Sequence, residues 1–184
     1  MQTRFFVVLF VFLLAAVSPT FAGDQKPFEG WAQQVGDPEL IDPVDYPYLA
    51  DVISENASWT PLFVGSQLVK FQGNINVGGK SSWKNAQLFY FFPTGTEIDD
   101  PFIGVIYEDS TITVANGDQI FIQVEGVYYS ATNTYITTDT VVGGTGRFEG
   151  AEGLIKVTPG LIKNNQSAAV FEGYIETVGE AKKE

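Results

Sequence analysis

Residues 110–129 read STITVANGDQIFIQVEGVYY, two runs of strand-forming residues on either side of Asn116-Gly117. An Asn-Gly pair between such runs favours a type I′ turn, the usual connection of a tight β-hairpin. Residues at every second position of the second run share one strand face: Ile120, Ile122, Val124, Gly126 and Tyr128. This alternation predicts an antiparallel hairpin with one buried face.

Strand patterns continue on both sides of the hairpin. The clearest is 67–77 (QLVKFQGNINV), where apolar and polar residues alternate without interruption. We expect eight strands separated by Gly, Pro and Asn turns: 28–35, 67–77, 86–92, 110–115, 119–129, 135–142, 148–157 and 168–178. Short strands with regular turns, and no long amphipathic helix, predict an all-β sandwich or barrel.

An aromatic-x-Gly triplet recurs in four of the expected strands: Phe28-Glu29-Gly30, Phe71-Gln72-Gly73, Phe148-Glu149-Gly150 and Phe171-Glu172-Gly173. The strand period of two places the ring and the glycine on one face. Because glycine weakens a strand, its repetition indicates kinks where a sheet curls and closes, with the ring covering the glycine backbone. We therefore expect a barrel rather than a sandwich.

The first 22 residues have the pattern of a secretory signal peptide. Arg4 precedes an apolar run from Phe5 to Val17, and small residues end the segment at Ala22. Thirteen apolar residues are too few to span a bilayer, which needs about 20. We expect cleavage near Ala22, a secreted protein (periplasmic if bacterial), and no membrane association after cleavage.

Residues 23–66 form a Pro-rich segment, with five of the nine prolines of the chain. Proline lacks a ladder donor and restricts the residue before it, so we expect irregular chain after one strand at 28–35. Retained apolar residues indicate that the segment packs on the barrel. We interpret it as a loop over a barrel mouth, with a short helix at Tyr48–Glu55 as an alternative, and we assign the barrel body to residues 67–184.

The composition excludes most catalytic chemistry. With no His and no Cys among 184 residues, imidazole bases, thiol nucleophiles, disulfides and ordinary zinc or copper sites are excluded. Only carboxylates remain as acid–base groups, and Glu125, Glu149 and Glu172 lie opposite the apolar faces of their strands, toward solvent. We therefore expect no catalytic residue, no metal site and no cofactor.

The charge balance also limits the partners. The net charge is −12, and removing the one Arg of residues 1–22 leaves −13 on the mature chain. Such a protein is repelled by phosphate backbones, so we expect no nucleic-acid partner. The acidic residues Glu97, Asp99, Asp100, Glu108 and Asp109 are more typical of a solvated loop region than of a Ca²⁺ site.

The segment Val141–Gly153 (VVGGTGRFEGAEG) resembles the Gly-Gly-Thr-Gly-[basic]-Phe-x-x-Ala-x-Gly signature of plant dirigent proteins and allene oxide cyclases. It is similar also to a group of exported, largely uncharacterised bacterial proteins, which 68–74 and 111–119 resemble as well. The resemblance implies a calycin-like, allene oxide cyclase-type, eight-stranded antiparallel β-barrel over residues 67–178. It does not imply an activity, because one fold hosts many functions.

Tyrosines are the best candidates for a ligand site, because they combine apolar area with a hydroxyl group. The residues that we select are Tyr90, Tyr107, Tyr128 and Tyr174, together with Arg147, which could project into the mouth. Asn56 and Asn165 begin N-glycosylation sequons in expected loops, relevant only in a eukaryotic secretory pathway.

These observations favour a secreted, non-enzymatic barrel that binds a small apolar or aromatic molecule, or a macromolecular partner, through its mouth and the Pro-rich segment. One alternative is a dirigent- or cyclase-like protein that steers a reactive intermediate in the lumen. The sequence therefore leaves open whether the protein is an enzyme. Another is a structural surface or matrix protein with a filled barrel. The sequence leaves homo-oligomer formation open.

Overall fold

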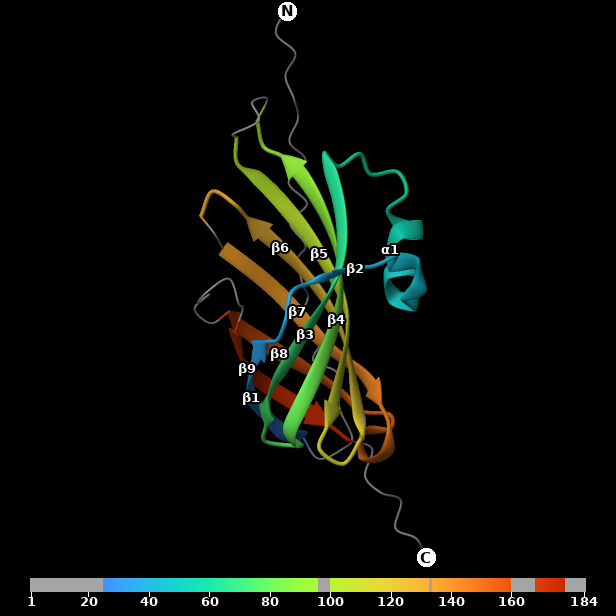
Figure 1. Cartoon of the computed structure of the whole chain (residues 1–184), viewed down its shortest axis with the longest axis vertical. Helices are drawn as coiled ribbons and strands as arrows, with labels where there is room; N and C mark the ends of the chain where they lie inside the picture. The colour runs from blue at the N-terminus through green and yellow to red at the C-terminus, as the bar shows by residue number, and fades with distance from the viewer. Residues whose placement is uncertain (1–24, 96–99, 133, 160–167, 178–184) are drawn as a thin grey trace, which may run out of the picture.

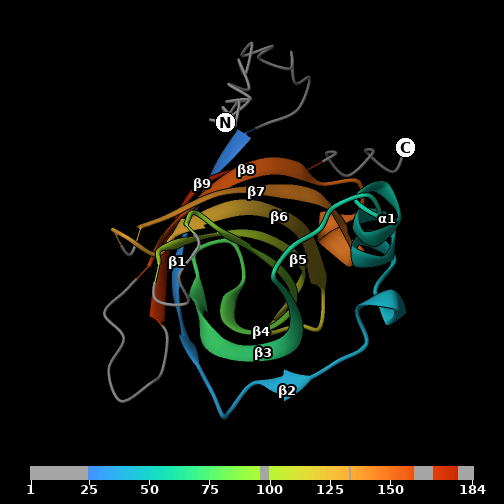
Figure 2. The ribbon, with the colours of Figure 1, turned by 90° about the horizontal axis from the view of Figure 1, so that it is seen from above.

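The computed structural model describes residues 25–95, 100–132, 134–159 and 168–177. The expected signal peptide and the sequon at Asn165 lie outside these residues. Eight antiparallel strands form the barrel: β1 (Gln25–Gln34), β3 (Phe63–Ile75), β4 (Gly79–Pro93), β5 (Phe102–Val114), β6 (Gln119–Tyr129), β7 (Thr134–Gly144), β8 (Glu152–Pro159) and β9 (Ala168–Glu176). The predicted all-β, eight-stranded antiparallel barrel is confirmed (Figures 1 and 2).

The sheet closes through its first strand. The strand order is β1-β9-β8-β7-β6-β5-β4-β3, and β1 pairs with both β9 and β3. A ninth strand, β2 (Glu39–Leu40), attaches to the outer part of β3 through two residue pairs. Because the strands pair in a closed ring, their own hydrogen bonds can hold the barrel together in a chain that has no cysteine.

The eight predicted strands all exist, but several boundaries differ. β4 and β5 are far longer than expected, because β4 begins at Gly79 and β5 at Phe102. β8 begins at Glu152 rather than Phe148, since Gly146–Phe148 form a short 3₁₀ helix, η2. The glycines on either side of this turn, Gly146 and Gly150, have φ of 60° and 66°, conformations that favour glycine. The triplet at Phe148 is therefore not in a strand.

The remaining triplets mark close approaches between backbones. A Cβ atom on Gly73 of β3 would lie 1.9 Å from the carbonyl oxygen of Trp31 in β1, at the pairing that closes the barrel. A Cβ on Gly173 of β9 would lie 2.2 Å from the carbonyl oxygen of Leu154. Only glycine allows the strands to come this close, as a tightly curved sheet requires.

Apolar side chains fill the end of the barrel that contains the β3–β4 and β5–β6 turns. This is the lower end in Figure 1. Trp83 of β4 stacks on Phe171 of β9 across the interior, with ring centroids 4.2 Å apart. The other buried members of this core are Phe28, Ala32, Ile75, Ile112, Val114, Ile120, Ile122, Val124, Val141, Phe148, Ala151, Ile155 and Ile175. This end of the barrel is therefore closed by packing.

The part of the Pro-rich segment between β1 and β3 runs along the outer wall and not across a mouth (Figure 2). A short 3₁₀ helix, η1 (Pro43–Asp45), precedes the helix α1 (Pro47–Glu55). The presence of α1 agrees with the alternative interpretation, a short helix at 48–55. Leu49 and Val52 of α1 are buried against outward-facing residues of β4, including Leu88. Among the described residues, no helix is long and apolar enough to cross a membrane.

Candidate ligand site in the upper half of the barrel

The inward face of β4 changes character along the strand. Since successive side chains alternate between faces, the residues on the same face as buried Trp83 are Asn85, Gln87, Phe89 and Phe91. The strand thus passes from an apolar plug through two amides to two aromatic rings. The neighbouring strands place Gln67 of β3 and Ser110 and Glu108 of β5 at the level of the amides, and Phe63 and Phe102 farther along. The interior above the core therefore contains a polar layer and then an aromatic layer.

The polar layer contains a chain of amides that converge on one carboxylate. Gln67 Nε2 donates to Gln87 Oε1 (2.7 Å), and Gln87 Nε2 donates to Glu108 Oε1 (2.7 Å). Asn85 Nδ2 donates to Glu108 Oε2 (3.1 Å). The register explains this order, because Gln67 is paired with Gln87 and Gln87 with Glu108 on adjacent strands.

A second carboxylate, Asp139 of β7, lies in the same layer. Glu108 and Asp139 are both paired with Val124 of β6, one on each side, so the strand spacing puts their Cα atoms about 10 Å apart. Burial, and then the charge of Asp139, raise the pKa of Glu108 to about 7, although the amides of Gln87 and Asn85 act in the opposite direction. Burial also raises the pKa of Asp139 to about 6, against a hydrogen bond with Thr137.

Three buried polar atoms of this layer have no hydrogen-bond partner among the described residues. They are Asn85 Oδ1, Ser110 Oγ and Asp139 Oδ1. Ser110 is only 3% exposed and lies two residues after Glu108 on the inward face of β5. Since a buried polar atom without a partner costs about 1–3 kcal/mol, a group of them indicates a place where something else is bound.

Above the polar layer lies a run of aromatic side chains that we call the aromatic arc: Phe63, Phe89, Phe91, Phe102, Tyr128 and Tyr135. The Phe91 ring contacts those of Phe63, Phe89 and Phe102, and the contacts continue from Phe102 to Tyr128 and Tyr135. The centroid distances range from 5.1 Å (Phe91 to Phe102) to 6.0 Å (Phe89 to Phe91). Phe63 is 59% exposed and Tyr135 37% exposed. The arc therefore offers accessible aromatic surface directly above buried polar groups.

The hydrogen-bonded pairing of β7 with β8 covers only three residue pairs, from Asp139–Ile155 to Val141–Gly153. Among the described residues, no further pairs of β7 with β8 follow from Asp139 toward Thr134, the end of β7 that carries Tyr135.

The structure does not bring the five sequence-selected ligand residues together. Tyr128 belongs to the aromatic arc. Tyr90 and Tyr107 lie on the outer wall beside α1, with their ring centroids 6.4 Å apart. Tyr174 lies on the outer face of β9, opposite Leu154 in the ladder. Arg147 lies in η2 near the lower end, with its Nε 3.5 Å from Asp118 Oδ2 and its guanidinium over the Phe148 ring.

Two other residues that the sequence analysis considered, Glu125 and Asn56, also lie on the outside of the barrel. Glu125 is exposed and accepts a hydrogen bond from the hydroxyl of Tyr48 in α1 (3.3 Å), and burial together with this carboxylate raises the pKa of Tyr48. Asn56, which begins a sequon, follows α1, and its Nδ2 donates to the carbonyl oxygen of Val52 (2.9 Å). Glu149 and Glu172 are also exposed; Glu172 faces outward from β9, as the strand pattern predicts, whereas Glu149 follows η2 and lies in no strand.

The sequence interpretation missed Glu108 because it assigned this residue to an acidic loop region, which is wrong. Glu108 lies in the middle of β5, faces inward and is 9% exposed, whereas Asp109 faces outward. The signal was available in residues 102–114 (FIGVIYEDSTITV), where every second residue is buried. Two adjacent acids concealed this alternation, and Asp139 was likewise overlooked in a predicted strand.

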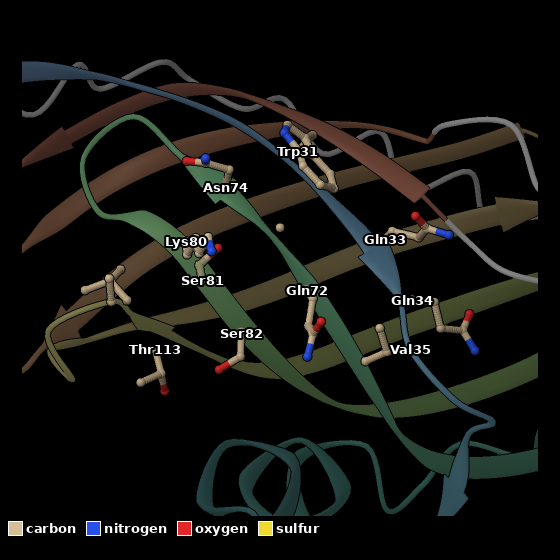
Figure 3. Close-up of a pocket in the computed structure, with 13 residues that line it drawn as sticks. Trp31, Gln33, Gln34, Val35, Gln72, Asn74, Lys80, Ser81, Ser82 and Thr113 are labelled. Atoms are coloured by element: carbon tan, nitrogen blue, oxygen red, sulfur yellow. The ribbon is translucent and has the colours of Figure 1, made fainter.

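A separate depression of about 750 Å³ lies on the outer face of β1, β3 and β4, bordered by the half-exposed ring of Trp31 (Figure 3). Most of its other side chains are polar, including Gln33, Gln72, Asn74 and Lys80. The depression is open to solvent, so water can satisfy these groups. It lies on the opposite side of the barrel wall from the polar layer.

Comparison with known protein families and with curated protein sequences finds no match for this chain. Among solved structures, one similar chain is the pterocarpan synthase dirigent protein GePTS1. The identity is 12%, the match covers 89% of this chain and 92% of that one, and the TM-score is 0.35. A likeness this distant carries no information about ligand or activity.

Proposed function

We propose that this protein is a secreted, non-enzymatic barrel that binds a small aromatic or apolar molecule inside its upper half. The observation that carries the proposal is the aromatic arc, whose partly exposed rings lie above three buried polar atoms without partners. Binding sites for small molecules combine apolar and aromatic walls with a few oriented polar groups. Secretion rests on the signal-peptide pattern of residues 1–22.

The layers suggest how such a ligand would lie. An aromatic body would stack against rings such as Phe91 and Tyr128, where edge-to-face and tilted contacts are already present. The apolar core around Trp83 would stop it from passing further down the barrel. The polar end of the ligand would then meet Ser110 and Asn85.

The first experiment is native mass spectrometry of the mature protein, purified from the organism that produces it. A mass above that of the protein alone would reveal a retained ligand. Binding is then measured by calorimetry with a panel of small aromatic compounds. The Phe91→Ala variant removes a half-buried ring from the centre of the arc, and we expect it to weaken binding about tenfold.

Trp31→Ala is the matched control, because it removes an exposed ring from the outer wall. We expect this variant to bind like the wild type. Loss of binding in Trp31→Ala, with normal binding in Phe91→Ala, would place the ligand in the outer depression and contradict the proposed site. A panel without any binder would contradict ligand binding itself.

A second candidate function, the steering of a reactive intermediate, is favoured by one observation. The pKa of Glu108 is raised to about 7, so this buried carboxyl could hold or release a proton near neutral pH. Turnover of an aromatic ligand by the wild type, together with its loss in Glu108→Gln, would support steering. Binding without turnover would support the non-enzymatic function.

A further inference from the structure

Donors and acceptors are unequally distributed in the polar layer. The side-chain amides of Gln67, Gln87 and Asn85 already donate to Gln87 or Glu108. Two of the three unpartnered atoms, Asn85 Oδ1 and Asp139 Oδ1, are acceptors, and the third is a hydroxyl group. The site thus offers oxygen acceptors to a ligand and has few donors left.

The charge of the layer is one-sided as well. Glu108 and Asp139 face inward, while the inward positions of β4, β5, β6 and β7, all within the described residues, carry no Lys or Arg. The nearby titratable groups on these inward faces are Tyr135 and, beyond it, Tyr128. Burial and the two carboxylates raise the pKa of Tyr135, so its hydroxyl stays neutral. No group of these strands compensates the two acids when they ionise.

We propose that the ligand of this barrel carries a positively charged hydrogen-bond donor, such as a primary ammonium or amidinium group, which binds between Glu108 and Asp139. The inference rests on the proposed function and specifies the chemistry of its ligand. A cation there would donate to Asp139 Oδ1, Asn85 Oδ1 and Ser110 Oγ, the atoms that have no partner. The adjacent rings of Tyr128 and Tyr135 would add cation–π attraction.

Three probes of similar size test this inference: 2-phenylethylamine, neutral 2-phenylethanol and anionic 3-phenylpropanoate. At about pH 8, where both carboxylates are ionised, we expect calorimetry to show the amine binding about tenfold or more tighter than the alcohol. At about pH 5 the preference falls, because both acids are protonated. The anion should bind most weakly at either pH.

Proton release gives an independent readout. Near pH 6.5 the amine would bind the ionised pair and displace protons from it, so its apparent binding enthalpy should vary with the ionisation enthalpy of the buffer. Binding of the alcohol should show no such variation. A structural role of the two acids would not produce this difference.

The variants Glu108→Gln and Asp139→Asn keep the shape of the site and remove one charge each. We expect them to reduce the preference for the amine to less than about threefold and to leave alcohol binding unchanged. The matched control is Glu125→Gln, an exposed acid of the outer wall, which should keep the wild-type preference.

The outcomes separate this inference from the proposed function. Equal binding of amine and alcohol by the wild type, or an unchanged preference in both inner variants, would refute the cationic ligand while leaving the aromatic site intact. Failure of all three probes to bind folded protein would contradict the aromatic site and this inference together.

Discussion

At the scale of single residues, Glu108 shows how burial converts a common side chain into a pH-sensitive one. Its carboxylate lies among Gln87, Asn85 and Asp139, away from water. In the unfolded chain the pKa of this group returns to about 4.5, while in the folded protein it is about 7. The folded state therefore favours the protonated form, and the free energy of unfolding falls as the pH rises between these values.

The Glu108→Gln variant tests this linkage. A glutamine stays neutral, so we expect the variant to be more stable than the wild type at about pH 8, by about 3 kcal/mol at most, and similar to it at about pH 4.5. The Asn85 amide can rotate so that its unpartnered Oδ1 accepts from the new amide. Urea unfolding at both pH values measures the difference.

Asp139 contributes a second slope, because its pKa of about 6 is also raised, so some pH dependence should remain in Glu108→Gln. Glu125→Gln serves as the control, since Glu125 is exposed on the outer wall and its replacement should leave the pH profile unchanged. A wild-type profile in Glu108→Gln would show that Glu108 is not the buried titrating group.

At the scale of elements, α1 shows why a Pro-rich segment becomes ordered. Pro47 occupies the first turn of the helix, where its missing N–H costs nothing. Leu49 and Val52 then bury their side chains on the outer faces of β4 and β5. A helix of nine residues is marginal alone, so this packing holds it in place.

Leu49→Ala tests the contribution of this contact. Leu49 is fully buried, and we expect its truncation to lower the free energy of unfolding by roughly 2–4 kcal/mol. Leu40→Ala is the matched control, because Leu40 is 94% exposed and its truncation should change stability by less than about 0.5 kcal/mol. Similar unfolding curves for the two variants would mean that α1 is not held by this contact.

The strands β4 and β5 also show where sequence interpretation stops. The hairpin turn at Asn116-Gly117 is visible in the sequence, because Gly117 adopts a φ of 91° that few other residues tolerate. The length of β5 was hidden, because Glu108 and Asp109 resemble a loop. One face of β4 points into the barrel interior and the other is covered by α1. Residues 86–92 therefore show no clear alternation of apolar and polar side chains.

At the scale of the whole molecule, closure between β1 and β3 decides whether the interior exists. Gly73→Ala tests it, because the new Cβ would lie 1.9 Å from the Trp31 carbonyl oxygen, a backbone atom that cannot move without opening the pairing. We expect a loss of at least about 2 kcal/mol in the free energy of unfolding. Urea unfolding followed by tryptophan fluorescence reports the change, since buried Trp83 stacks on Phe171 across the interior.

Gly65→Ala in the same strand is the control for Gly73→Ala. Its Cβ would meet only the exposed ring of Phe63, at 2.9 Å, and that ring can turn away. We expect a much smaller loss of stability. Equal losses in the two variants would indicate that glycine at these positions serves strand flexibility generally and not the closing approach.

The sequence by itself determined that the eight barrel strands exist, that Asn116-Gly117 forms a hairpin turn and which chemistry is absent, because alternation, turn residues and the lack of His and Cys are local properties. Tertiary structure alone decided which inward-facing residues of different strands lie side by side in the lumen. Glu108 and Asp139, 31 positions apart in the chain, lie in one layer only because β6 separates them by a single strand. Barrel closure turned these two ordinary acids into the buried pair on which the proposed ligand chemistry depends.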